Sequence, residues 1–170
     1  MAVKDYVGSV ITISQTLSFD IKELYKNLKL WFKDREYGVA EPKYAEKFIS
    51  EGKKNVSFKW VCEKKMDPYT KLVIELTFDS KASDVVVEKD DKKHVVQEGE
   101  IKLTLAPYIS RDIEDEWSLR KETGLQRFIR EVYDKFSKKN KYEDYERRLK
   151  KDIDAIVYDI KNYVRQHRFD

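Results

Sequence analysis

Hydrophobic and polar residues alternate along several short segments in the first part of the chain. The clearest segments are residues 9–17, 55–65 and 69–78. Their apolar sets are Ile11, Ile13 and Leu17, then Val56, Phe58, Trp60 and Cys62, then Leu72, Ile74, Leu76 and Phe78. A period of two is typical of strands that bury one face and expose the other. Because Asp67-Pro68 separates the last two segments, they are predicted to form a β-hairpin.

Weaker alternation predicts further strands. The candidates are residues 43–50, 85–87, 94–97 and 100–106. Asp90-Asp91 lies between the second and third candidates and predicts another hairpin. Pro107 is expected to end the last strand, because proline cannot donate a backbone hydrogen bond. Together these segments predict an antiparallel sheet of about five to seven strands.

Apolar residues recur every three or four positions between residues 20 and 37, which is the period of a helix. The stripe consists of Ile21, Leu24, Tyr25, Leu28, Trp31 and Phe32. Asp20 precedes the stripe and Glu23 follows three residues later, as in the capping box of a helix N-terminus. Gly38 is expected to end this helix, because glycine readily adopts the left-handed conformation of a helix C-terminus.

The helical period returns at residue 125 and continues almost to the end of the chain. Thr123 is a candidate N-cap for a stripe of Leu125, Phe128, Ile129, Val132, Tyr133 and Phe136. A further stripe contains Tyr142, Tyr145, Leu149, Ile153, Ile156, Val157, Ile160, Tyr163 and Val164. The polar run 137–141 between the two stripes predicts a break or bend in the helix.

These elements predict an α+β fold in which helices cover one face of an antiparallel sheet. Residues 1–123 would form a strand-rich core. Residues 124–170 would form a helical region that is either part of the same domain or an appendage used in assembly. Three apolar helical stripes compete for one sheet face, so we expect some apolar helical surface to remain for a partner.

The order of a strand, a helix, several antiparallel strands and a long C-terminal helix resembles the helix-grip (START/Bet v 1-like) superfamily. The resemblance covers residues 9–137, or 9–165 with the whole last helix, and lies in the order of the elements. It implies a curved sheet around a long terminal helix, often with a cavity for lipids or other apolar ligands. It assigns no role to individual residues.

The composition narrows the setting in which the protein is expected to act. A chain of 170 residues, of which 41% are hydrophobic and 13% aromatic, is long enough to form one domain with a real core. Charged residues make up 39%, which is above the ordinary quarter. Cys62 is the single cysteine, and no apolar run reaches the roughly 18 residues of a membrane span. We therefore expect a soluble, cytoplasmic protein. High Lys and Glu with little Cys and Met also resembles the composition of thermophile proteins.

Residues suited to catalysis or metal binding are few. An acidic cluster of Asp112, Glu114, Asp115 and Glu116 lacks the ligand spacing and central glycine of a calcium loop, so we interpret it as a solvated loop. His94 and His167 have no Cys, Asp or Glu at ligand spacing. Cys62 lies in phase with apolar residues and is expected to be buried. We therefore predict no metal, no cofactor and no catalytic residue.

Two other groups of side chains suggest binding. Residues 120–170 carry 15 Lys and Arg against 10 Asp and Glu, and the candidates for contact with a polyanion are Lys138, Lys139, Lys141, Arg147 and Arg148. Tyr142 and Tyr145 are interleaved with them, and such rings can stack on bases. Alternatively, aromatic residues could line a pocket between sheet and helix: Trp31, Phe32, Phe48, Phe58, Trp60, Phe78 and Trp117.

The patterns favour a non-catalytic function over an enzymatic one. The first hypothesis is a binding or assembly module that contacts a protein partner or a second copy through Leu149, Ile153, Ile156, Ile160, Tyr163 and Val164. The alternative is a carrier of a small apolar ligand in a cavity under the helix. Nucleic-acid binding by the basic C-terminal helices is the third hypothesis.

Overall fold

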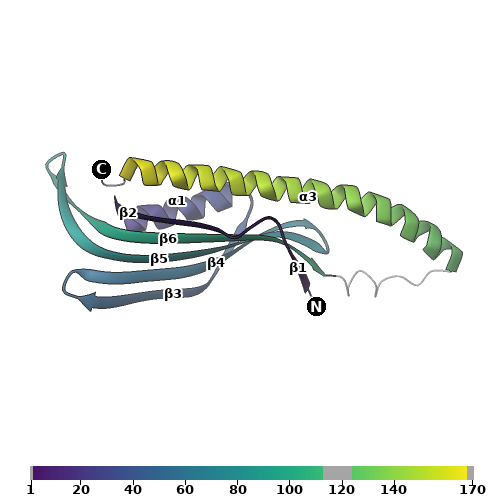
Figure 1. The fold of residues 1–170 in the computed structure, drawn as a ribbon, viewed down its shortest axis with the longest axis horizontal. Coiled ribbons are helices and arrows are strands. Elements are labelled where there is room, and N and C mark those ends of the chain that lie inside the picture. Colours follow the sequence, from purple (N-terminus) through teal and green to yellow (C-terminus); the bar gives the residue numbers. More distant parts are fainter. Residues whose placement is uncertain (1, 113–123, 168–170) are drawn as a thin grey trace.

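The computed structural model describes residues 2–112 and 124–167. The elements are β1 (Ala2–Tyr6), β2 (Ile11–Phe19), α1 (Ile21–Asp34), β3 (Gly38–Ser50), β4 (Lys53–Asp67), β5 (Thr70–Lys89), β6 (Lys92–Asp112) and α3 (Gly124–His167). The six strands form one antiparallel sheet in the order β1-β6-β5-β4-β3, and β2 also pairs with β6. The predicted α+β class with an antiparallel sheet is therefore confirmed (Figure 1).

Two short strands share one side of β6. β1, which we did not predict, pairs with residues 108–112, and β2 pairs with residues 97–105. Pro107 lies inside β6 between these two pairings, so the prediction that it ends the strand is wrong. Its carbonyl accepts a hydrogen bond from the Val7 backbone N–H at 3.1 Å. The proline nitrogen faces the same side, so the missing donor falls in the gap between β1 and β2.

Both predicted hairpins are present, and their strands are longer than the alternation indicates. β4 and β5 meet at a turn in which Asp67 Oδ1 accepts a hydrogen bond from the Tyr69 backbone N–H at 2.9 Å. β5 and β6 are joined by Asp90 and Asp91, whose φ angles of 55° and 58° match the twist of a two-residue hairpin. The separate strands predicted at 85–87, 94–97 and 100–106 are thus parts of β5 and β6.

Helix α1 begins at a well-capped N-terminus. The Asp20 carboxylate accepts hydrogen bonds from the backbone N–H groups of Lys22 and Glu23 at 2.9 and 3.2 Å, as the capping pattern predicts. The preceding N–H, that of Ile21, donates to Gln97 Oε1 on β6 at 2.9 Å. These bonds fix the first turn of α1 against the sheet.

The other end of α1 differs from the prediction. The left-handed residue is Glu36, with a φ angle of 65°, while Gly38 begins β3. The Glu36 N–H donates to the Lys33 carbonyl, and the Tyr37 N–H donates to the Phe32 carbonyl. This pair of bonds is the Schellman motif, and the Phe32 and Tyr37 rings supply its usual apolar contact. The left-handed position of this motif lies two residues before Gly38, so Glu36 adopts the conformation that was expected of the glycine.

Helix α3 is one continuous helix of 44 residues, so the predicted break at 137–141 is wrong. At 1.5 Å per residue it is about 66 Å long. No glycine or proline follows Gly124 within the helix, and the polar residues of 137–141 are all compatible with helical backbone. In Figure 1 the helix curves gently along the sheet, and its first part extends beyond the strands.

The core lies between both helices and one face of the sheet, which we call the inner face. It includes Phe58, Trp60, Leu76 and Phe78, and the predicted core pair Trp60 and Leu76 are cross-strand partners with no exposed surface. Two hydrogen bonds also join α3 to α1 and to the turn that follows α1. Trp31 Nε1 donates to Asp159 Oδ2 at 2.9 Å, and the Tyr37 hydroxyl donates to Asp152 Oδ2 at 2.8 Å.

Candidate functional site

The helices leave one end of the inner face uncovered, near the β3–β4 hairpin. There, Tyr44 and Phe48 are 50% and 80% exposed. A groove of about 420 Å³ opens between the start of α1 and these strands. Its lining includes Tyr25, Tyr44, Val56, Phe58, Glu41 and Glu46. The groove therefore combines aromatic rings and carboxylates at a place where the inner face is accessible.

A bulge in β3 sets which of the following side chains lie on the inner face. The pairing of β3 with β4 shifts register at Glu41-Pro42 and then resumes. Beyond this point Tyr44 lies opposite Phe58, so both rings belong to the inner face. Before the bulge Ala40 lies opposite Val61, so Glu41 falls next to Trp60 on the same face and accepts a hydrogen bond from its indole.

Three rings from three different elements form the aromatic part of the groove. The centroid of the Tyr25 ring on α1 lies 6.4 Å from that of Tyr44 and 5.1 Å from that of Phe58, with interplanar angles of 86° and 76°. Tyr44 and Phe58 are nearly parallel, at 11°, with their centroids 6.4 Å apart. A ligand in the groove would therefore contact aromatic surface from both the helix and the sheet.

Hydrogen bonds hold both carboxylates beside these rings. Glu41 Oε2 accepts from the Tyr25 hydroxyl at 2.6 Å and from Trp60 Nε1 at 2.7 Å, and Glu46 Oε1 accepts from the Tyr44 hydroxyl at 2.9 Å. Burial and the bond to Glu41 raise the pKa of Tyr25, and burial with the bond to Glu46 raises the pKa of Tyr44 to about 12. Both hydroxyls thus stay protonated at neutral pH.

The side chains of this groove are suited to non-covalent binding. The residues that line it are tyrosine, phenylalanine, aliphatic, glutamate and lysine, and none of them is a histidine, cysteine or serine. Aromatic walls with a few oriented polar groups are typical of small-molecule sites. The rings offer contact to an apolar group, and the carboxylates offer acceptors to a donor or a positive charge.

The stripe predicted to contact a partner packs inside the chain instead. Leu149, Ile153, Ile156, Ile160 and Val164 are buried in the core, and Tyr163 is partly buried against it. The expectation that this stripe remains as a partner interface is therefore corrected. One sheet face accommodates both α1 and this part of α3, because β5 and β6 are about twice as long as predicted and provide more area.

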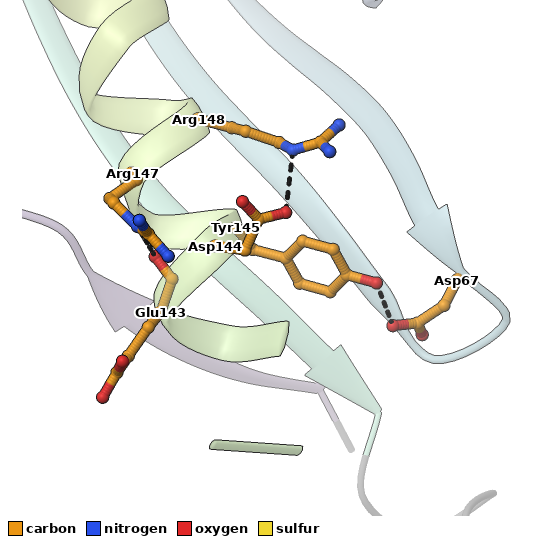
Figure 2. A network of polar contacts seen from close by, with 6 residues as sticks. All are labelled: Asp67, Glu143, Asp144, Tyr145, Arg147 and Arg148. Carbon is orange, nitrogen blue, oxygen red and sulfur yellow. Dashed lines mark hydrogen bonds and ion pairs between the residues drawn. The ribbon is translucent and has the colours of Figure 1, made fainter. Parts of the chain in front are cut away.

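Two of the basic residues proposed for a polyanion, both arginines, make local contacts on α3. Figure 2 shows Arg148 Nε paired with Asp144 at 3.0 Å and Arg147 Nε donating to the backbone carbonyl of Glu143 at 3.4 Å. Lys139 and Lys141 are exposed. The side chain of Lys138 lies outside the described part of the structure.

The two tyrosines interleaved with these basic residues are used by the fold. The Tyr145 hydroxyl donates to Asp67 Oδ2 in the β4–β5 turn at 3.1 Å (Figure 2). The Tyr142 ring lies 4.9 Å from the guanidinium of Arg111 on β6. Both rings therefore attach α3 to the sheet. Nucleic-acid binding remains a hypothesis that would have to rely on the cations alone.

The remaining candidates divide into two groups. Glu114, Asp115, Glu116 and Thr123 lie outside the described residues, as does the side chain of Asp112. His94 and His167 are exposed, and His167 stacks on the Tyr163 ring. Within residues 2–112 and 124–167, no three His, Cys, Asp or Glu side chains gather as metal ligands would.

Cys62 is buried, as predicted, on the inner face of β4. Burial raises the pKa of its thiol to about 12. The thiol is therefore protonated at neutral pH, and a protonated, enclosed thiol is a poor nucleophile.

Sequence reasoning identified only part of the groove. Of the predicted aromatic pocket, Phe58 lines the groove and Phe48 is exposed at the same end of the sheet, whereas Trp60 and Phe78 are core and Trp117 lies outside the described residues. Tyr25, Glu41 and Glu46 were not singled out. The available signal was the alternation of Tyr44, Glu46 and Phe48 along one strand, which mixes aromatic and charged residues on a face that elsewhere is apolar.

Comparisons with known proteins add no relative: no protein-family model, no curated protein and no solved structure matches this chain. The resemblance to the helix-grip superfamily is therefore not confirmed. In the described part of the chain, no helix has the length and apolar character that crossing a membrane requires.

Proposed function

We propose that this protein is a non-catalytic binding protein and that it holds a small ligand with an apolar portion in the groove between α1 and the β3–β4 hairpin. The observation that carries the proposal is the uncovered inner face at this point. The groove at this point has a volume of about 420 Å³, which lies in the range typical of ligand sites, roughly 300–1,000 Å³. Three rings and two hydrogen-bonded carboxylates surround the space.

The first turn of α1 gives the groove a fixed wall. Gln97 and Asp20 hold the backbone of this turn, and the Tyr25 ring packs 4.9 Å from the buried Trp60 ring. A site whose walls are already held in place loses little conformational entropy when a ligand binds. Binding is thus the function that the local structure supports best.

Native mass spectrometry of the purified full chain tests the proposal, together with titration by the neutral fluorophore 1-aminoanthracene. We expect one saturable site, and we expect Tyr44→Ala to weaken it by about tenfold or more, because a half-exposed wall is removed. Tyr158→Ala is the matched control, since Tyr158 is 65% exposed on α3 and distant in sequence from the groove. Equal binding by both variants, or no saturable site, would contradict the proposal.

Assembly through apolar helical surface is a second candidate, favoured by a different observation. Leu125, Phe128 and Val132 on the first part of α3 are 73%, 64% and 45% exposed, at the spacing of one helix face. The partner would be another protein or a second copy of the chain. Light scattering of the protein and of Phe128→Glu tests this candidate. A mass equal to the monomer at micromolar concentration would contradict self-assembly.

A further inference from the structure

The two carboxylates of the groove form no ion pair with a residue that the structure describes. Among residues 2–112 and 124–167, the ion pairs within 4.0 Å involve other acidic groups, and none includes Glu41 or Glu46. In the described part of the chain, the hydrogen bonds to these carboxylates come from the neutral donors of Tyr25, Tyr44 and Trp60. Both negative charges are therefore held in place beside aromatic rings without being neutralised.

Two lysines also line the groove, but unlike the carboxylates their charged groups are not held by hydrogen bonds in the part of the chain that the structure describes. Lys22 and Lys54 belong to its lining, yet within the described residues their ammonium groups make no hydrogen bond or ion pair. A long, unanchored lysine side chain extends its charge toward water. The anchored charge of the groove is thus negative, although its lining contains equal numbers of lysine and glutamate.

The rings beside these carboxylates suit a cation as well. The face of a tyrosine or phenylalanine ring is electron-rich and attracts an ammonium group within about 6 Å of the ring centroid. Tyr25 already shows this behaviour, because Nζ of Lys29 lies 5.7 Å from its centroid. The Tyr44 ring, half exposed and parallel to Phe58, offers similar surface to a molecule from solution.

We propose that the ligand of this groove is a small organic cation, an amine or quaternary ammonium group attached to an apolar substituent. This inference rests on the proposed function and specifies the class of ligand. The cation would lie against the rings of Tyr25 and Tyr44, with its charge balanced by Glu41 and Glu46. Its apolar substituent would cover the exposed aromatic surface of Tyr44 and Phe48.

Nuclear magnetic resonance titration of the full chain tests the inference, because the Trp60 indole N–H donates to Glu41 and reports directly on that carboxylate. The probes are choline, benzyltrimethylammonium and 3,3-dimethyl-1-butanol, which is the neutral isostere of choline. We expect both cations to shift the indole resonance saturably. The neutral alcohol should bind about tenfold more weakly or worse, because it lacks the charge that the rings and carboxylates attract.

Matched variants separate charge from shape. Glu41→Gln keeps an acceptor oxygen for Tyr25 and Trp60 but removes the charge, so affinity for the cations should fall about tenfold while affinity for the alcohol stays the same. Glu88→Gln removes one charge from an exposed position on β5 and should change neither affinity. Tyr44→Phe should retain cation binding, whereas Tyr44→Leu, which keeps an apolar group without a ring, should lose most of it.

The outcomes distinguish this inference from the function on which it rests. Equal or tighter binding of the neutral alcohol, or unchanged cation affinity in Glu41→Gln, would overturn the cation inference. If neither cation shifts the resonance up to about 50 mM while 1-aminoanthracene still binds at Tyr44, the ligand is apolar and the proposed function stands. If no probe binds at the groove, both proposals fail.

Discussion

The two ends of the inner face differ sharply, although the same alternation of residues produces both. Phe58 on β4 is 2% exposed, while Phe48, on the same face of the neighbouring strand β3, is 80% exposed. Helices cover the first residue and end before they reach the second. The comparison shows that alternation specifies which face a side chain occupies, while the helices determine whether that face is dry.

The inner-face residues change in character where the helix cover ends. Under the helices the face consists of apolar residues such as Leu76, Phe78 and Leu103. Beyond α1 it includes Glu46 and Lys54 next to Tyr44. Charged residues on an inner face carry a large desolvation cost unless water or a ligand reaches them. The change in character therefore marks the boundary between the core and the groove.

The largest effect is expected from placing charge in the covered region. Ile153→Glu combined with Ile160→Glu puts two carboxylates into positions that are 5% and 4% exposed, without partners. We expect a loss of more than about 5 kcal/mol, sufficient to unfold the whole domain. Circular dichroism and thermal denaturation measure this loss.

Tyr158→Glu with Gln166→Glu is the control for that double variant. It adds the same charge to exposed positions of the same helix and should remain folded. If the Ile153 and Ile160 variant instead stayed folded and merely changed its oligomeric state, this stripe would be an interface between copies, and the packing described above would be incorrect.

The second prediction compares one substitution at the two ends of the inner face. Phe58→Ala should lower the free energy of unfolding by about 3–5 kcal/mol, because it leaves a cavity among Tyr25, Trp60 and Phe78. Phe48→Ala should change it by less than about 0.5 kcal/mol, since the side chain is mostly in water. Urea denaturation of both variants measures the difference. A cost for Phe48→Ala close to that for Phe58→Ala would mean that another part of the protein covers the groove.

Local patterns predicted most of the elements, and packing between distant segments explains what they missed. The alternation of residues 55–78 and the cap at Asp20 are local signals, and both predictions were confirmed. The continuity of α3 was missed because a polar run can be solvated helix as easily as a break. The burial of its second stripe depends on the length of β5 and β6, which no local pattern reveals.

Gly99 illustrates a constraint that only the folded chain shows. It lies on β6 opposite Ala82, and a Cβ atom there would come within 2.1 Å of the Lys81 backbone carbonyl oxygen. In the sequence it is a single glycine within a strand pattern, which suggests only a bulge or a close approach. The groove was hidden for a related reason, because its walls come from α1, β3 and β4, which only the folded chain brings together.

The third prediction uses thiol reactivity to compare the same two ends. Cys62 is buried under the helices, so in the native protein it should react with a thiol reagent only through unfolding. A cysteine introduced as Phe48→Cys should react at once, since that position is open to solvent. Absorbance with an aromatic disulfide reagent at pH 8 should therefore show one fast thiol and one slow thiol. Two fast thiols would show that the covered end opens readily.

The buried thiol also predicts how stability depends on pH in alkaline solution. An unfolded cysteine ionises near about pH 8.5, while burial raises the pKa of Cys62 in the folded chain to about 12. The stabilising contribution of the protonated, buried thiol is therefore fully present below the lower value. It is lost as pH rises from there to the higher value, because the unfolded chain releases the proton first.

Compared with Cys62→Ala, the native protein should lose up to about 1.4 kcal/mol more of its free energy of unfolding per pH unit in this window. The raised pKa values of Tyr25, Tyr44 and Tyr163 do not depend on Cys62, so they are shared by both proteins and cancel in the difference. Parallel pH dependences in urea denaturation would contradict a dry environment for this thiol, and with it the distinction between the covered and the open end of the inner face.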